Sequence, residues 1–224
     1  MNHIEAVIAR RIKFILEKQA FISFAFDTHK GRYRKLKKSI FPSKTGNKNQ
    51  ILEINKFLVD YFSNVVKNVL EICESDPRSA RLRYDEYFRE IIRELHRKLE
   101  DSGLCNKFNE DTPIFWAYFT KMVNIIIYDL ITHNELVETS KFHKIKWFIH
   151  APIDNKIISE LRRRIPSLED LRKMNEIKKM LKFYKRLDSI DSEESYDQIQ
   201  RAIRIVQDMR DEPPIYIEDA YSLT

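Results

Sequence analysis

The chain has 224 residues, a formal net charge of +6 and 33% charged residues. Its three glycines and seven prolines are few, so the composition favours helices over a turn-rich sheet protein. Two cysteines are too few for a disulfide framework or a cysteine-rich zinc site. No uncharged apolar run approaches the roughly 18 residues of a membrane span, and Arg10, Arg11 and Lys13 interrupt any signal-peptide core. We therefore expect an all-α, intracellular (cytoplasmic) protein with no membrane partner.

Apolar residues recur at helical spacing over residues 2–25, which predicts an amphipathic helix. The following basic arm, residues 28–50, contains no acidic residue. A block of like charge is often a solvated loop, but it can also bind nucleic-acid phosphates by releasing counterions. On the second interpretation, the DNA-binding candidates are Lys30, Arg32, Arg34, Lys35, Lys37 and Lys38.

Two further amphipathic helices are predicted for residues 51–73 and 79–99, separated at Ser75-Asp-Pro77. In the second, arginines and glutamates alternate at four-residue steps, which indicates salt bridges on a solvated face. We interpret both helices as scaffold.

The next predicted helix, residues 112–132, has Lys121 as the only charged residue between Asp111 and Asp129. A helix that is apolar on nearly every side is normally buried. An ammonium group there must reach solvent, pair with an acid or lose its proton. Two interpretations stay open: a lysine at the rim of a core helix, or a functional lysine.

Residues 150–164 contain an extended turn followed by a basic helix. Pro152 favours extended geometry in Ala151, and Asp154 stands where a helix N-cap is expected. Taken alone, Asp154 is most simply a cap.

Three histidines near this turn, His133, His143 and His150, invite a metal-site interpretation. However, no acidic or cysteine partner stands at ligand spacing, and the chain has no His-Glu-x-x-His motif. We expect neither a metal ion nor a cofactor.

After Pro166, the sequence Ser167-Leu-Glu-Asp170 has the form of a capping signal and predicts a helix to about Leu187. Another helix is predicted for residues 195–209. The first has a basic face made of Lys173, Lys178, Lys179, Lys182, Lys185 and Arg186. Neither helix carries a recognisable active-site pattern.

The order of an apolar helix with one lysine, Lys121, and a later Pro152-Ile-Asp154 turn resembles the helix-hairpin-helix (HhH-GPD) DNA glycosylase superfamily. In that superfamily the lysine attacks the sugar, and the aspartate at a helix start is the catalytic acid group. The C-terminal sequence Pro213-Pro-Ile-Tyr-Ile-Glu-Asp219 is similar to the Pro-Pro-Leu-His-Leu-Asp tail of the archaeal 8-oxoguanine DNA glycosylases. Those enzymes also have a Lys-Met pair in the lysine helix, as Lys121-Met122 does here.

The resemblance covers residues 112–165 and 212–223 and departs from the family at two points. Trp116-Ala-Tyr-Phe-Thr120 replaces the Gly-x-Gly that usually precedes the lysine, which implies an atypical hairpin. Ser222 stands where the archaeal enzymes have a tryptophan that helps to hold the oxidised base. The resemblance therefore does not identify the excised base.

The resemblance implies a single all-α domain, residues 1–224, with two helical lobes around a DNA-binding cleft. It implies a nucleoid-associated DNA N-glycosylase with AP-lyase activity that acts on DNA with a damaged or modified base. Lys121 would attack the sugar, and Asp154 would stabilise the developing positive charge. Glu218 would contact the base, with the adjacent Asp219 as an alternative, and Trp147 could line the base pocket or belong to the core.

Two other classes of function stay open. The chain could be a non-catalytic helical DNA-binding or regulatory protein that uses the basic arm, chiefly residues 30–48, or a partner-binding scaffold. Geometry separates these classes, because an enzyme requires the Lys121 amine and the Asp154 carboxylate to face the same cleft.

Overall fold

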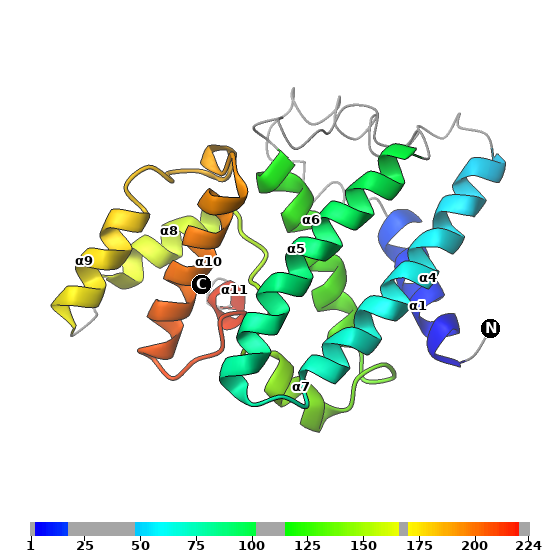
Figure 1. Cartoon of the computed structure of the whole chain (residues 1–224), viewed down its shortest axis with the longest axis horizontal. Helices are drawn as coiled ribbons and strands as arrows, with labels where there is room; N and C mark the ends of the chain where they lie inside the picture. Colours follow the sequence, from blue (N-terminus) through cyan, green and yellow to red (C-terminus); the bar gives the residue numbers. More distant parts are fainter. Residues whose placement is uncertain (1–2, 18–47, 102–114, 166–169, 220–224) are drawn as a thin grey trace. The chain divides into compact units, whose positions relative to one another are not determined.

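The structure is a computed structural model that describes residues 3–17, 48–101, 115–165 and 170–219 (Figure 1). Within these ranges the chain forms helices and their connections, and no strand, which confirms the predicted all-α class. None of the helices in these ranges combines the length and the apolar composition needed to cross a membrane. The elements are α1 (His3–Glu17), α4 (Lys48–Ile72), α5 (Pro77–Asp101), α6 (Phe115–Ile131), α7 (Thr139–Ile145), α8 (Asn155–Arg164), α9 (Leu171–Met180), η2 (Leu187–Ser189), α10 (Glu193–Asp208) and α11 (Tyr216–Asp219).

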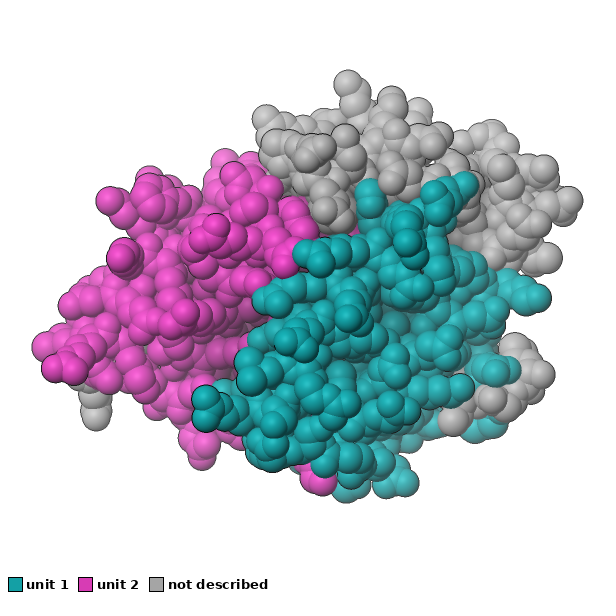
Figure 2. All heavy atoms as spheres, in the orientation of Figure 1, with its two compact units in different colours: residues 1–108, 125–143 teal, residues 109–124, 144–224 magenta. Residues whose placement is uncertain are grey.

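The chain divides into two compact units (Figure 2). Unit 1 comprises residues 1–108 and 125–143, and unit 2 comprises residues 109–124 and 144–224. Helix α6 contributes to both, because the boundary falls between Asn124 and Ile125.

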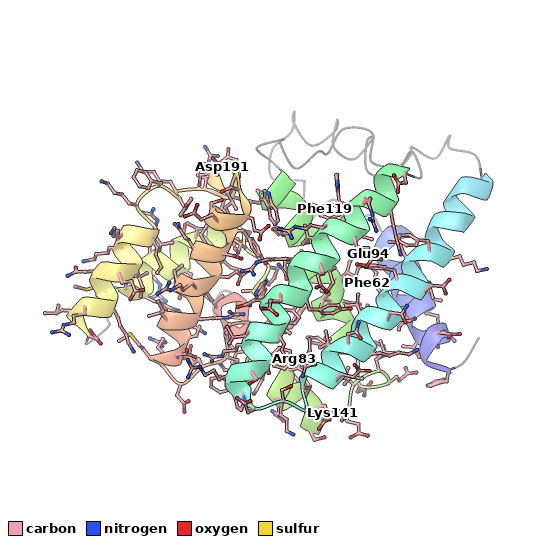
Figure 3. The ribbon with its side chains drawn as sticks, viewed as in Figure 1. Phe62, Arg83, Glu94, Phe119, Lys141 and Asp191 are labelled. Atoms are coloured by element: carbon pink, nitrogen blue, oxygen red, sulfur yellow. The ribbon has the colours of Figure 1, made fainter. Side chains whose placement is uncertain are left out.

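Unit 1 is built on α4, which packs against both α1 and α5. The apolar residues of α4 recur every three or four positions, so they form one buried stripe; Phe62, labelled in Figure 3, is fully buried within it. The break before α5 lies at the predicted place. There the Asp76 carboxylate accepts a hydrogen bond from the backbone N–H of Ser79 at 3.1 Å, and Pro77 occupies the first helical position.

In unit 2, α10 packs against both α8 and α9, and α11 packs against α8. Helix α10 begins two residues before the predicted start, because the Ser192 hydroxyl caps it by accepting a hydrogen bond from the backbone N–H of Ser195 at 3.2 Å. The short helices α7 and α11 were not expected from the sequence, since neither is long enough to show a helical period.

The prediction that the helix after Pro166 extends to about Leu187 is wrong, because α9 ends at Met180. Its start is set by Asp170, whose carboxylate accepts hydrogen bonds from the backbone N–H groups of Arg172 and Lys173 at 2.9 and 3.1 Å. Beyond its end, the guanidinium of Arg162 donates to the backbone carbonyl of Leu181 at 2.5 Å. This side chain comes from α8, so the contact at the end of α9 cannot be read from the local sequence.

Candidate active site

Lys121 lies on the part of α6 that belongs to unit 2 and is only 6% exposed. Its neighbours along the helix, Phe119, Met122 and Val123, are buried apolar side chains. The Lys121 Nζ atom lies 3.5 Å from Oδ2 of Asp154, which also belongs to unit 2. Of the three ways to accommodate a lysine in such a helix, the structure shows pairing with an acid.

Asp154 is the N-cap of α8 and has extended backbone geometry, with φ −143° and ψ −178°. Its two carboxylate oxygens have different partners. Oδ1 accepts the backbone N–H of Ile157 at 2.8 Å, and Oδ2 faces the Lys121 amine. The carboxylate, whose side chain is 24% exposed, also lies at the positive end of the helix dipole. Asp154 is therefore both a cap and the partner of Lys121.

The extended segment before Asp154 is held to α10 through its backbone. The side-chain amide of Gln200 makes two hydrogen bonds to Ala151: its Nε2 donates to the carbonyl at 2.7 Å, and its Oε1 accepts the N–H at 3.2 Å. Ala151 and Ile153 are buried, so both backbone bonds are shielded from water. This segment is therefore fixed before the chain reaches the carboxylate.

A buried polar cluster, which we call the Tyr196 cluster, consists of Asn124, His150, Tyr196 and Gln200. Each of the four residues is at most 4% exposed. Asn124 Nδ2 lies 2.8 Å from the Tyr196 hydroxyl, Gln200 Nε2 lies 3.0 Å from it, and His150 Nδ1 lies 2.9 Å from it. Asn124 stands one helical turn after Lys121, and His150 stands four residues before Asp154. The cluster therefore joins the two chain segments that carry the lysine and the aspartate.

Tyr196 and Gln200 were not predicted as site residues, and His150 was considered only as a metal ligand. A signal was present, because Tyr196 and Gln200 stand four residues apart on the apolar face of α10, with Ile199 and Ile203. A glutamine on a buried face needs hydrogen-bond partners inside the protein. Which partners it finds is not readable from that pattern.

A second polar network in unit 2 ties α8 to α10 and to the segment after α10. Glu160 accepts hydrogen bonds from the guanidinium groups of Arg163 and Arg164, each at 2.7 Å, and Arg164 also reaches Gln207 at 2.6 Å and Glu212 at 3.0 Å. Hydrogen bonds from Arg163 and then Arg164 lower the pKa of Glu160 to about 2. We interpret this network as structural, because its groups satisfy one another.

The structure describes the other candidate residues in less detail. Trp147 is half-buried in the turn after α7, so it belongs neither to the deep core nor to the open surface. Glu218 and Asp219 lie in α11, and their side chains are outside the described part of the structure. Residues 28–47 of the basic arm also lie outside the described residues, whereas residues 48–50 form the start of α4. The predicted helix start before Phe115 lies outside the described residues as well. Among candidate residues whose side chains are described, the structure brings together Lys121 and Asp154.

The histidines considered as metal ligands differ in environment: His143 is exposed, His133 half-buried and His150 buried. Within the described ranges, no three His, Cys, Asp or Glu side chains are grouped as a metal site would require. His150 instead contacts Tyr196, with ring centroids 5.6 Å apart.

Comparisons with protein-family models, with curated proteins and with solved structures found no match for this chain. The function of the site must therefore be argued from the chemistry of its own residues.

Proposed function

We propose that this protein is a DNA N-glycosylase with AP-lyase activity that excises a damaged or modified base through an imine on Lys121. The observation that supports the proposal is the buried Lys121 amine, 3.5 Å from the carboxylate that caps α8. Removing an ammonium and a carboxylate from water is unfavourable, and paired titratable groups in a buried setting are typical of functional sites. Their types and order along the chain also match those of the glycosylase resemblance.

The reaction assigns a separate task to each residue. A target base must first leave the helical stack, because its glycosidic bond is hindered inside a duplex. The Lys121 ammonium releases a proton to water, and the lone pair of the resulting amine then forms a bond to C1′ while the C1′–N glycosidic bond breaks. The base leaves with the bonding electrons and takes up a proton from water. The Asp154 carboxylate stabilises the positive charge that develops on the sugar and accepts the proton that leaves the amine.

The lyase step follows from the covalent intermediate. Opening of the sugar ring converts the lysine adduct into an imine, which acidifies the C2′ protons. Loss of one C2′ proton and departure of the 3′ phosphate oxygen with its electron pair cleave the strand by β-elimination. Water then hydrolyses the imine and returns the Lys121 amine.

Borohydride trapping tests this proposal directly, because reduction of the imine makes a permanent protein–DNA bond. Wild-type protein is incubated with duplexes carrying an abasic site or one of a panel of modified bases. We expect wild type to trap and Lys121→Gln to lose trapping while it still folds and binds DNA. Lys156→Gln is the matched control, because Lys156 is an exposed lysine two residues after Asp154 and should leave trapping unchanged.

Two results would contradict the proposal. If wild type binds DNA but traps on no substrate, the lyase mechanism is wrong, and a non-catalytic DNA-binding protein that uses the basic arm becomes the better interpretation. If Lys121→Gln traps as well as wild type, another amine is the nucleophile.

A further inference from the structure

We propose that Tyr196 is the positioning residue of this site: its hydroxyl sets the spacing between the helix that carries Lys121 and the segment that carries Asp154. The catalytic part of this inference rests on the proposed function. The geometric part stands on the hydrogen bonds of the Tyr196 cluster alone.

The Lys121–Asp154 contact does not fix its own geometry. At 3.5 Å it is longer than the roughly 2.7–2.9 Å of a strong charge-assisted hydrogen bond. By contrast, the three contacts of the Tyr196 hydroxyl measure 2.8, 2.9 and 3.0 Å. They reach α6 through Asn124, the aspartate segment through His150, and α10 through Gln200. The short, buried bonds therefore hold the two segments, and the longer contact between lysine and aspartate follows from them.

The hydrogen-bonding capacities of the Tyr196 cluster predict its protonation state. A tyrosine hydroxyl donates one hydrogen bond and accepts about two. Gln200 Nε2 is a donor whose orientation is set by its two bonds to Ala151, and Asn124 Nδ2 is the second donor. The hydroxyl proton is then directed to Nδ1 of His150. With this orientation of the Asn124 amide, we expect His150 to be neutral and to carry its proton on Nε2.

If the Asn124 amide has the opposite orientation, a different tautomer of His150 is expected. Tyr196 would then donate to the Asn124 oxygen, and His150 would have to donate from Nδ1. Nitrogen-15 NMR of histidine-labelled protein distinguishes the two tautomers in the folded wild type. We expect the neutral Nε2–H form for His150, and an Nδ1–H or doubly protonated ring at neutral pH would overturn the assignment.

Tyr196→Phe tests the positioning role, because it removes the hydroxyl and keeps the ring. A misplacement of about 1 Å between reacting groups can slow a reaction roughly a hundredfold, so we expect imine formation at saturating abasic DNA to slow by about 10- to 100-fold. The dissociation constant for the same DNA should stay within about twofold of wild type, because no DNA-binding group is altered. A general loss of folded protein would instead reduce the amount of protein that traps and the amount that binds DNA together.

Tyr184→Phe is the matched control. The Tyr184 hydroxyl also donates to a glutamine of α10, Gln198 Oε1 at 3.0 Å, and belongs to the same unit. Removing it should leave the trapping rate unchanged. If wild type traps and Tyr196→Phe traps equally fast, the positioning role is wrong. If wild type does not trap, the proposed function fails, while the NMR measurement still decides the cluster geometry without requiring a variant to fold.

A second inference comes from an independent observation, the basic outer surface of α9 and the turn that follows it. We infer that this α9 surface binds the phosphate backbone of single-stranded nucleic acid. All of its cationic side chains are exposed: Arg172, Lys173, Lys178, Lys179, Lys182, Lys185 and Arg186.

The two acids of this segment whose side chains are described, Asp170 and Glu176, are outnumbered by its cations and have partners of their own. The Asp170 carboxylate accepts the backbone N–H groups that begin α9, and Glu176 accepts a hydrogen bond from Arg201 of α10 at 2.7 Å. The surface therefore presents a concentrated positive charge, which favours polyanions through counterion release.

An exposed aromatic ring indicates which polyanion fits. Phe183 is 72% exposed, and the Lys182 ammonium lies 5.4 Å from its ring centroid. Cations next to an exposed ring suit a single strand, whose phosphates pair with the cations while an unpaired base stacks on the ring. A membrane surface fits less well, because Ile177 is buried and α9 packs against α10, which leaves Leu171 as the exposed large apolar side chain of this helix.

Fluorescence anisotropy with a labelled oligothymidine, measured over a range of salt concentrations, tests this surface. The triple change Lys178→Gln, Lys179→Gln and Lys182→Gln should flatten the slope of log affinity against log salt by about 2, because each single-strand phosphate that a lysine neutralises contributes about 0.7 to the slope. Phe183→Ala should weaken binding by roughly 5- to 100-fold, since the stacking of one base on an aromatic ring is removed.

Matched controls remove the same groups elsewhere. Lys56→Gln, Lys67→Gln and Lys144→Gln together remove three other exposed lysines, and Leu82→Ala removes an exposed apolar side chain of 59% exposure. Both should leave oligothymidine binding and its salt slope close to wild type. If the α9 variants behave like these controls, or if they lose binding to anionic phospholipid vesicles and not to oligothymidine, the inference is wrong.

Discussion

The two units of this protein differ in what they bury. Among the described residues, unit 1 contains two buried polar side chains, Ser63 and His96. Unit 2 contains the other nine, and they include the lysine of the candidate site: Thr120, Lys121, Asn124, His150, Glu160, Arg164, Ser195, Gln200 and Gln207. Burying polar groups is unfavourable unless they are hydrogen-bonded, so their concentration in one unit needs a reason.

Among the described ion pairs, the most deeply buried cations follow the same division, although the Arg11–Asp129 pair of unit 1 is also part-buried. In unit 1, Lys141, labelled in Figure 3, pairs with Glu74 at 2.8 Å through side chains that are 39% and 60% exposed. Exposed pairs of this kind contribute little to stability. In unit 2, Lys121 and Arg164 have side chains only 7% and 8% exposed in their ion pairs. The comparison indicates that unit 1 is an apolar scaffold, while unit 2 carries polar groups that serve either function or a specific packing arrangement.

Substitutions in the two interiors should therefore differ in their effect on stability. Phe62→Ala removes a fully buried ring from unit 1 and should lower the free energy of unfolding by about 3–5 kcal/mol. Lys121→Met should leave it within about 1 kcal/mol of wild type, because methionine suits a buried apolar helix and Asp154 keeps its cap bond and some exposure. Urea denaturation measures both values. A large loss in Lys121→Met would show that the pair is structural.

Asp154→Asn separates capping from catalysis within unit 2. Asparagine caps a helix about as well as aspartate, so stability should change by less than about 1 kcal/mol. Base excision should fall by on the order of a hundredfold or more, because the charge that stabilises the transition state is removed. Single-turnover excision and thermal unfolding of the same preparations measure the two effects. Equal activity in the two proteins would mean that Asp154 serves only as the N-cap of α8.

The Glu160 network should make unit 2 sensitive to acid. The pKa of Glu160 is lowered to about 2 by hydrogen bonds from Arg163 and Arg164, so between about pH 4.5 and pH 2 the unfolded chain binds more protons than the folded protein. Its contribution is complete above about pH 4.5 and is lost as the pH falls towards 2. Allowing for the exposure of Arg163, we expect a loss of roughly 2 kcal/mol.

Free energies of unfolding across this pH range, for wild type and Glu160→Gln, measure that contribution. The substitution removes the titrating group, so the difference between the two proteins should narrow as the pH falls. Parallel pH profiles would mean that Glu160 titrates normally in the folded protein.

The basic arm gives the smallest expected effect. Its side chains lie outside the described part of the structure. Neutralising Lys35, Lys37 and Lys38 should flatten the slope of log affinity against log salt for duplex DNA by two to three units, because each duplex phosphate that a lysine neutralises contributes about 0.9. Binding measured over a range of salt concentrations checks this. An unchanged slope would identify the arm as a solvated loop.

Features that depend on nearby residues were predictable from the sequence. The all-α class, the break at Ser75-Asp-Pro77 and Asp154 as an N-cap agree with the structure, because periodicity, proline and capping act between residues a few positions apart. The types of the candidate catalytic residues were also readable, since a lone lysine in an apolar helix requires explanation. Their catalytic roles stay predictions.

The tertiary structure alone decided which polar groups meet. Lys121 and Asp154 are 33 residues apart, and Asn124 and Tyr196 are 72 residues apart. No local pattern specifies such partners, because a buried hydrogen bond depends on how whole helices pack. For the same reason the C-terminal end of α9 was misplaced, since the arginine that binds the carbonyl just beyond it comes from α8. The sequence by itself indicated where the longer helices lie and which residues are unusual, and the packing of α6, α8 and α10 determined what those residues contact.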